Sequence, residues 1–251
     1  MSEVKDTKSV ERVFAILETF ERERRSLSLK ELAEYCQIPI STCHGLIRTM
    51  IHRSYLYQGG RRKDVYPTRR LYDIAKTILE NDPVLQRLAP LLENIRDLTR
   101  ETIILGKRQK DNIVYLEVLE SPQTIRYSAN VGDIKPLHST CIGKAMLSTL
   151  PPEELRSWLE SKTMEKITDF TIVSYARLIE NLQDGKRLGY FTTRGENVAD
   201  VTAVAVPVTV NNELYALAVA GPSHRMDGNF DRCVKFLLQA QDSLFARGIA
   251  A

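Results

Sequence analysis

Residues 28–66, SLKELAEYCQIPISTCHGLIRTMIHRSYLYQGGRRKDVY, decide the fold of the N-terminal part of this chain. Ser28 and Glu31 stand at capping-box spacing, which predicts a helix start at this point. Gln37, Ile38 and Pro39 end that helix, because proline cannot continue the amide ladder and restricts the residue before it. The next helix is predicted to start with Ser41 or Thr42 as its N-cap. Its inward face is Cys43, Leu46, Ile47 and Met50.

The flanking residues complete a recognisable pattern. Before this stretch, apolar residues recur at helical spacing from Ser9, which predicts a first helix with one apolar face. After it, residues 55–57 and 65–66 are strand-like, and Gly59 and Gly60 permit a tight reversal between them. Three helices followed by a two-stranded hairpin indicate a winged helix-turn-helix. The apolar face of the first helix is Val10, Val13, Phe14, Leu17 and Phe20, and the wing tip carries Arg61, Arg62 and Lys63.

Two cysteines and two histidines between residues 36 and 52 raise the alternative of a zinc site. A structural zinc site usually has C-x₂₋₄-C and H-x₃₋₅-H spacing, whereas this stretch has C-x₆-C and H-x₇-H. Cys43 lies on the inward helical face, so His44 points away from it. We therefore interpret Cys36 and Cys43 as small core residues, and expect neither a metal nor another cofactor.

The outward face of the same helix carries short polar and basic side chains that suit DNA. Residues 41–70 contain seven basic residues and one acidic residue. Residues 1–80 hold 15 Lys and Arg against 11 Asp and Glu, a net charge of +4, while residues 81–251 hold 20 against 21, a net charge of −1. Such residues can also be merely exposed, but the basic wing favours nucleic-acid binding. The predicted DNA contacts are Ser41, Thr42, His44, Gly45, Arg48, Arg53, Arg61, Arg62 and Lys63.

The rest of the chain predicts a separate α+β domain with an antiparallel sheet. We expect a DNA-binding domain over 1–67, a linker helix over 68–82 that breaks at Pro83, and an effector-binding, oligomerising domain over 83–251. The predicted strands are 102–107, 113–119, 190–193, 201–210 and 214–220, and the predicted helices are 83–100, 139–150, a short one from 151, 174–188 and 229–247.

Composition indicates a cytoplasmic protein. The N-terminus is polar and lacks the apolar core of a signal peptide, and no apolar run approaches the roughly 18 residues that span a bilayer. The four cysteines form no C-x-x-C pair, so we expect free thiols.

The chain resembles the IclR family of bacterial transcription regulators along nearly its whole length. SVERVFAILETF and LSLKELAEYCQIPISTCHGLIRTM are similar to the family's DNA-binding domain. ETIILG, IVYLEVLES, PLHSTCIGKAMLSTLP, LGYFTTRGENVADVTAVAVPV and LYALAVAGP follow its effector-domain motifs in order. The resemblance implies a GAF-like effector domain, dimers or tetramers on palindromic operators, and control by a small metabolite, often an organic or aromatic acid.

Several positions depart from the family pattern. Gly45 stands where the family commonly has arginine, which implies an unusual operator or a close approach of a backbone. Thr193-Arg194-Gly195-Glu196 replaces an acidic pair. Ala218 and Ala220 occupy positions where some members have serine, which implies a less polar pocket wall.

Residues 138–143 are predicted to open a helix whose free amides and positive dipole end can hold a carboxylate. An ordinary N-cap is the alternative reading of this segment. Small side chains on neighbouring strands leave room for an apolar body such as a ring, so we expect an aromatic or otherwise apolar acid. The predicted effector contacts are His138, Ser139, Thr140, Cys141, Ile142, Thr193, Arg194, Asp200, Val201, Ala203, Ala218 and Ala220.

Two other functional classes are an enzyme and a winged-helix protein that binds other proteins. His138 and Cys141 could form a thiol-based catalytic pair, but no third group is evidently placed to orient the histidine, so we do not expect an enzyme. A winged-helix protein that contacts other proteins is disfavoured by the basic wing tip. The sequence leaves open the effector, activation or repression, the operator and target genes, and dimer or tetramer.

Overall fold

The computed structural model describes residues 7–59 and 63–246, and it divides the chain into two compact units, residues 1–82 and 83–251. The first unit has one hydrophobic core. The second unit has two, which lie on opposite faces of its sheet. Arg61 and Arg62 of the predicted wing tip lie outside the described residues.

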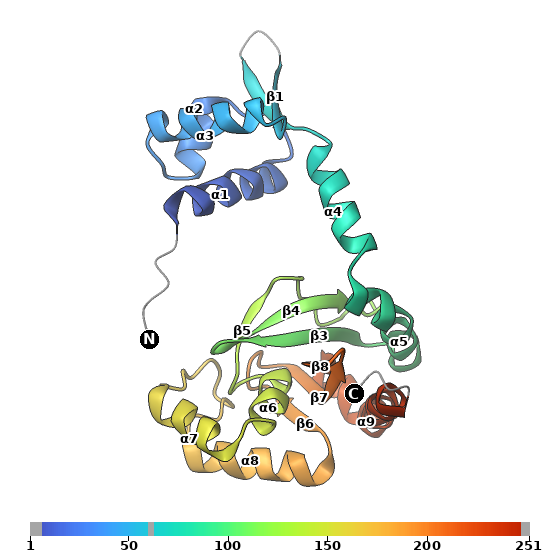
Figure 1. Cartoon of the computed structure of the whole chain (residues 1–251). Helices are drawn as coiled ribbons and strands as arrows, with labels where there is room; N and C mark the ends of the chain where they lie inside the picture. The colour runs from blue at the N-terminus through green and yellow to red at the C-terminus, as the bar shows by residue number, and fades with distance from the viewer. Residues whose placement is uncertain (1–6, 60–62, 247–251) are drawn as a thin grey trace. The chain divides into compact units, whose positions relative to one another are not determined.

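The first unit is a winged helix-turn-helix, as predicted (Figure 1). Ser28 caps the second helix, with its hydroxyl accepting from the Glu31 amide and the Glu31 carboxylate accepting from the Ser28 amide, so the capping box is confirmed. The elements are α1 (Lys8–Glu23), α2 (Leu29–Tyr35), α3 (Ile40–His52), β1 (Leu56–Gly59), β2 (Asp64–Pro67) and α4 (Arg70–Glu80).

Two local predictions for this unit are wrong. Val10 and Phe14 of α1 are 51% and 58% exposed, because α1 is buried in the small core mainly at Ile16 and Phe20, with Val13 and Leu17 partly buried against it. The third helix begins at Ile40, directly after Pro39, and has no side-chain cap. Proline fixes φ near its helical value, so the helix starts without the predicted Ser41 or Thr42 cap.

Helix α4 confirms the helix expected after the wing, but none of its residues is buried. Its apolar side is nevertheless continuous, with Leu71, Ile74, Ala75, Ile78 and Leu79 at helical spacing. Ile78 and Leu79 are among the most exposed apolar side chains of the described residues.

The second unit is a six-stranded antiparallel sheet covered by helices on both faces. The strand order is β5-β4-β3-β8-β7-β6. Helices α6, α7 and α8 pack on one face, and α5 and α9 pack on the other (Figure 1). The elements are α5 (Pro83–Thr99), β3 (Thr102–Gln109), β4 (Asn112–Leu119), β5 (Ile134–Pro136), α6 (Cys141–Ser148), α7 (Pro152–Ser161), α8 (Tyr175–Leu188), β6 (Phe191–Arg194), β7 (Val201–Val210), β8 (Glu213–Pro222) and α9 (Ser223–Ala246).

The two long strands β7 and β8 sort their side chains by size between the two faces of the sheet. Because successive residues of a strand point to opposite faces, one face receives alanines and the other receives larger residues. The α9 face carries Val204, Val206, Tyr215, Leu217 and Val219. The α6 face carries Ala203, Ala205, Ala216, Ala218 and Ala220, which allows a close approach of helix α6.

Two elements of this unit differ from the predictions. Strand β5 was not predicted, because it has three residues and ends in proline, and only its pairing with β4 makes it a strand. Helix α9 begins at Ser223 instead of residue 229. Met226 is fully buried and Arg225 forms a two-point ion pair with the buried carboxylate of Glu101, so tertiary contacts favour the helical conformation of this polar first turn.

Among the helices of the described residues, none has the length and apolarity that crossing a membrane requires.

Candidate functional sites

The outward face of α3 and the base of the wing form one groove in the first unit. Its polar lining comes from His44 and Arg48 of α3, Gln58 of β1, and Lys63, which lies just before β2. The Gln58 side-chain amide donates to the Lys63 carbonyl at 2.8 Å and so connects the two sides of the hairpin. Among the described residues, none that lines this groove is acidic. The groove therefore presents cations and hydrogen-bond donors without a competing negative charge.

Four of the other predicted DNA contacts lie in α3 or at its C-cap. Ser41, Gly45 and Arg53 are exposed, and Thr42 is half-buried. They do not line the groove itself. Gln58 was not among the predicted DNA contacts, because no sequence pattern marks a single glutamine in a short strand, and only the position of the wing beside α3 brings it into the groove.

Gly45 is a helix-interior glycine that no internal contact requires. A Cβ at this position would meet nothing within 4 Å, so steric exclusion within the protein does not explain it. We expect Gly45→Ala to stabilise the first unit by about 0.5–1 kcal/mol, because alanine loses less backbone entropy in a helix. Thermal unfolding followed by far-ultraviolet circular dichroism would measure the shift. A lowered midpoint would contradict this account of the position.

The cysteines and histidines of residues 36–52 do not converge. Cys43 is fully buried in the core of the first unit, and burial raises the pKa of its thiol to about 11, while His44 is exposed. Within residues 7–59 and 63–246, no group of three or more His, Cys, Asp or Glu side chains could hold a metal ion.

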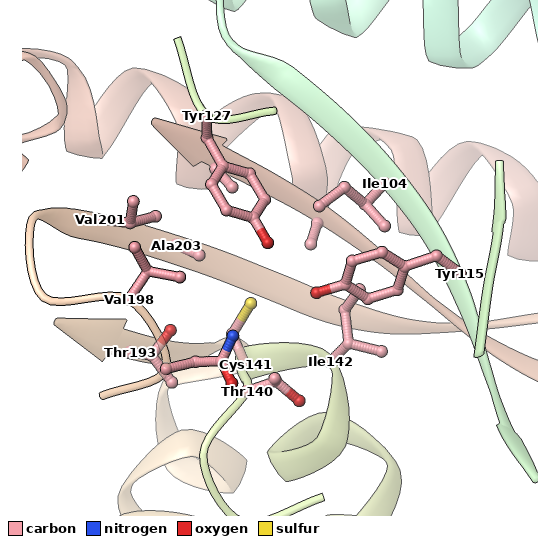
Figure 2. A pocket seen from close by; sticks show the side chains of 13 residues that line it. Ile104, Tyr115, Tyr127, Thr140, Cys141, Ile142, Thr193, Val198, Val201 and Ala203 are labelled. Carbon is pink, nitrogen blue, oxygen red and sulfur yellow. The ribbon is translucent and has the colours of Figure 1, made fainter. Parts of the chain in front are cut away.

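A cavity in the second unit lies between the alanine-rich face of the sheet and the start of α6 (Figure 2). Ala203, Ala218 and Ala220 form its floor, because Ala203 of β7 pairs with Ala220 of β8 and Ala218 is the next residue of β8 on the same face. Among the described residues, the lining is Ile104, Tyr115, Tyr127, Thr140, Cys141, Ile142, Thr193, Asn197, Val198, Val201, Ala203, Ala218 and Ala220. No lysine, arginine or histidine is among these residues.

The first turn of α6 supplies hydrogen-bond donors to this cavity. Thr140 is the N-cap, which is the alternative that the sequence left open for this segment, and its hydroxyl accepts from the Gly143 amide at 3.0 Å. The amides of Cys141 and Ile142 occupy the first helical positions, where no carbonyl of the helix can accept from them. Both residues line the cavity. The positive end of the helix dipole therefore supplies positive potential to a cavity whose lining has no cationic side chain.

Two tyrosine hydroxyls point into the same cavity from the opposite side (Figure 2). Burial raises the pKa of both Tyr115 and Tyr127, so each stays protonated and can donate or accept. The enclosed space is about 30 Å³, enough for one or two water molecules. A ligand that contains a ring therefore requires lining side chains to move, and Val198, 43% exposed at the mouth, is placed to do so.

The alternative thiol chemistry finds little support in this geometry. Burial raises the pKa of Cys141 to about 12, which keeps the thiol protonated at neutral pH and so unreactive as a nucleophile. His138 Nε2 lies 2.9 Å from the Glu165 carbonyl, and burial lowers the pKa of its imidazole. The histidine therefore pairs with backbone rather than with Cys141.

Four of the predicted effector contacts do not line the cavity. His138 pairs with Glu165, and Ser139 contacts Asn197 at 3.4 Å behind the lining. Arg194 is exposed and pairs with Asp227 at 2.6 Å. Asp200 is also exposed, and its backbone carbonyl accepts from the amide at the start of α9. The other eight predicted residues lie together around the cavity.

Five lining residues were missed, namely Ile104, Tyr115, Tyr127, Asn197 and Val198. For Tyr115 a signal existed, since it alternates with the fully buried Ile113 along β4 and so faces the same side. Tyr127, Asn197 and Val198 lie in irregular segments, where no periodicity indicates direction.

Comparisons with known proteins agree with this architecture. Residues 76–244 match the family model of the bacterial transcriptional regulator IclR C-terminal domain, and residues 9–60 match that of the IclR helix-turn-helix domain. The HTH-type transcriptional regulator KdgR of Dickeya chrysanthemi is 30% identical over 215 residues, which cover 86% of this chain and 69% of that protein. The HTH-type transcriptional repressor AllR of Escherichia coli K12 is 26% identical over 224 residues, which cover 88% of this chain and 83% of that protein.

Solved structures show the same fold. The Thermotoga maritima IclR structure superposes with a TM-score of 0.81 at 20% identity, covering 97% of this chain and 99% of that one. An IclR homologue from Microbacterium hydrocarbonoxydans, solved in complex with 4-hydroxybenzoate, superposes with a TM-score of 0.74 at 24% identity, covering 95% and 99%. With both family models matched in order along its two units, this chain belongs to the IclR family of bacterial transcription regulators.

Proposed function

We propose that this protein is a cytoplasmic regulator that binds a palindromic operator as a homodimer or homotetramer and responds to a small organic acid. The observation that carries the proposal is the cavity at the start of α6, where the first turn of that helix and two tyrosine hydroxyls border an apolar floor. Amides at a helix N-terminus suit a carboxylate, and the alanine floor suits an apolar or aromatic body. The structure of the 4-hydroxybenzoate complex of a homologue supports this ligand class.

The effector is expected to act by changing the packing of the second unit and thereby the spacing of two recognition helices. Such coupling requires that the effector bind the two packing arrangements of the second unit, one for each spacing of the recognition helices, with different affinity. The exposed apolar side of α4 suits a contact between protomers in this assembly. An effector that alters neither operator affinity nor the length of the protected DNA would contradict the mechanism.

Arg48 is expected to be the strongest single DNA contact of the groove. Arg48→Ala should weaken operator binding by about 1–3 kcal/mol per half-site, because a bidentate arginine contact to guanine is lost. The measurement is fluorescence anisotropy with DNA from upstream of the protein's own gene and a scrambled competitor, at two salt concentrations. Arg156→Ala removes the same charge from an exposed position of helix α7 and serves as the control, which should bind as the wild type does. Equal affinities of the two variants would contradict the assignment.

The ligand class can be tested by titration calorimetry with 4-hydroxybenzoate and other benzoate-type acids, against two- and three-carbon keto acids. We expect the aromatic acids to bind, and Tyr115→Phe to weaken binding by about 0.5–1.5 kcal/mol through the loss of one hydrogen bond. Tyr215→Phe is the control, since Tyr215 lies on the α9 face of the sheet. Binding of the short keto acids alone would refute an aromatic or apolar effector.

A further inference from the structure

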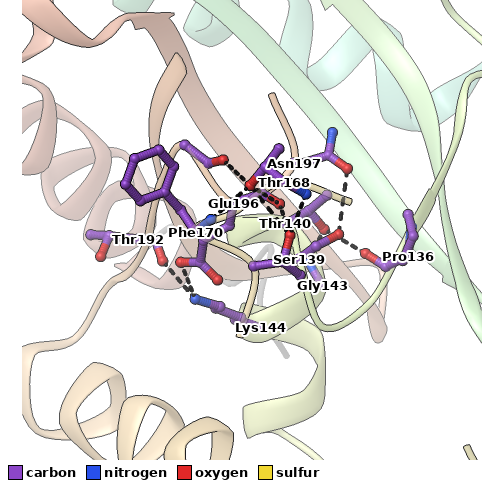
Figure 3. Close-up of polar contacts among 12 residues, drawn as sticks. Pro136, Ser139, Thr140, Gly143, Lys144, Thr168, Phe170, Thr192, Glu196 and Asn197 are labelled. Carbon is purple, nitrogen blue, oxygen red and sulfur yellow. Dashed lines mark hydrogen bonds and ion pairs between the residues drawn. The ribbon is translucent and has the colours of Figure 1, made fainter. Parts of the chain in front are cut away.

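A buried ion pair lies immediately beside the cavity without lining it (Figure 3). The Lys144 ammonium donates to Glu196 Oε1 at 2.7 Å and to the Thr192 carbonyl at 3.1 Å. The two side chains are 0% and 9% exposed. Neither residue belongs to the DNA-binding surface or the cavity lining, so the proposed function does not account for them.

Glu196 belongs to the segment 195–200, which joins β6 to β7 and forms one wall of the cavity mouth. The next two residues, Asn197 and Val198, line the cavity. The segment is also anchored from its outer side, where the Thr168 hydroxyl donates to the Gly195 carbonyl at 2.6 Å and the Thr171 hydroxyl donates to the Glu196 carbonyl at 2.7 Å (Figure 3).

Lys144 connects this segment to the helix that faces the ligand site. Lys144 lies one turn after Cys141 in α6. Its ion pair therefore connects the helix whose first turn borders the cavity to the segment at the cavity mouth. A second side-chain contact of the segment is that between Ser139 Oγ, just before α6, and Asn197 Oδ1, at 3.4 Å, which is long for a hydrogen bond between oxygens. Among the described residues, Lys144 is the one side chain that donates to the Glu196 carboxylate. Lys144 is therefore the main polar attachment of Glu196 to α6.

We propose that Lys144 and Glu196 are positioning residues that fasten the segment 195–200 to helix α6 and thereby limit how far the cavity opens. The cavity has room for one or two water molecules, so this fastening sets the resistance that an entering ligand meets. The proposal takes its ligand from the proposed function, but its first test requires no ligand.

The first test measures the access of reagent to Cys141, which lines the cavity and is buried. Iodoacetamide labelling of the full-length protein is followed by mass spectrometry of the cysteine peptides. The variants are Lys144→Met/Glu196→Met and the more conservative Lys144→Gln/Glu196→Gln. Each removes one positive and one negative charge, and these charges shift the pKa of Cys141 in opposite directions, so the labelling rate reports access.

We expect Cys141 to be labelled at least about tenfold faster in both variants, because the segment opens locally more often. Cys233 and Cys43 are internal controls, buried in the core on the α9 face and in the first unit, and their rates should not change. An unchanged Cys141 rate in both folded variants overturns the proposal. So does a parallel rise of Cys141 and Cys233 in both, since the pair would then stabilise the whole domain instead of the segment.

A second readout is 4-hydroxybenzoate binding by calorimetry. Altered affinity in the variants together with faster Cys141 labelling supports the positioning role. If the wild-type protein does not bind 4-hydroxybenzoate, the proposed ligand class fails, while the labelling result still decides whether the pair fastens the segment.

Discussion

Replacing Gly143 by alanine is expected to destabilise the second unit by about 3 kcal/mol and to abolish ligand binding in its cavity. A Cβ at Gly143 would lie 2.1 Å from the Leu137 carbonyl oxygen and 2.5 Å from its Cα. These are backbone atoms of a fully buried residue that directly follows β5, so no side-chain rotation relieves the overlap. The start of α6 would have to move away, and with it the amides that face the cavity.

Trp158 provides a selective measurement of this effect. It is the single tryptophan of the chain and is buried in the core beneath α6, so its fluorescence reports unfolding of the second unit. Urea titration of Gly143→Ala should show a lower midpoint than the wild type. Gly228→Ala is the matched control, because Gly228 also lies in a helix of this unit and a Cβ there meets nothing within 4 Å. Equal midpoints for the two variants would show that α6 tolerates the displacement.

Removing Lys144 alone is the second change with a large expected effect. Burial lowers the pKa of Lys144 and raises the pKa of Glu196, so each charge is opposed by its surroundings and favoured mainly by its partner. Lys144→Met leaves the Glu196 carboxylate buried without a cation. We expect a loss of about 3–5 kcal/mol of unfolding free energy, the usual cost of breaking a buried pair from one side.

Two control variants separate this effect from a general loss of charge. Lys144→Met/Glu196→Met should recover most of the stability, because replacing a buried pair by apolar side chains of similar volume is often neutral or stabilising, by about 1–4 kcal/mol. Lys107→Met breaks an ion pair with Glu213 whose partners are 37% and 55% exposed, and should cost about 0–1 kcal/mol. If Lys144→Met and Lys107→Met unfold at the same urea concentration, breaking the buried ion pair costs no more free energy than breaking an exposed one, which contradicts the prediction.

Much of the first unit could be predicted from its sequence, because its signals are local. The Ser28–Glu31 capping box, the break at Pro39 and the hairpin act within a few residues, and the structure confirms each of them. The burial of individual α1 residues could not be predicted. Val10 and Phe14 have the same helical spacing as Phe20, but the small core reaches Phe20 and leaves the other two exposed. The groove residue Gln58 likewise became visible only when the wing was placed beside α3.

In the second unit, the sequence by itself determined the family, the main strands and the helix that begins at the N-cap Thr140, since these depend on periodicity and local hydrogen bonds. Only the tertiary structure decided the position of β5, the tyrosines that close the cavity, and the pairing of Lys144 with Glu196. These features join residues up to about a hundred positions apart in a sheet of order β5-β4-β3-β8-β7-β6. Periodicity fixes which side of a strand or helix is apolar, but the neighbour that each side chain meets depends on strand order and on irregular segments, which no local pattern specifies.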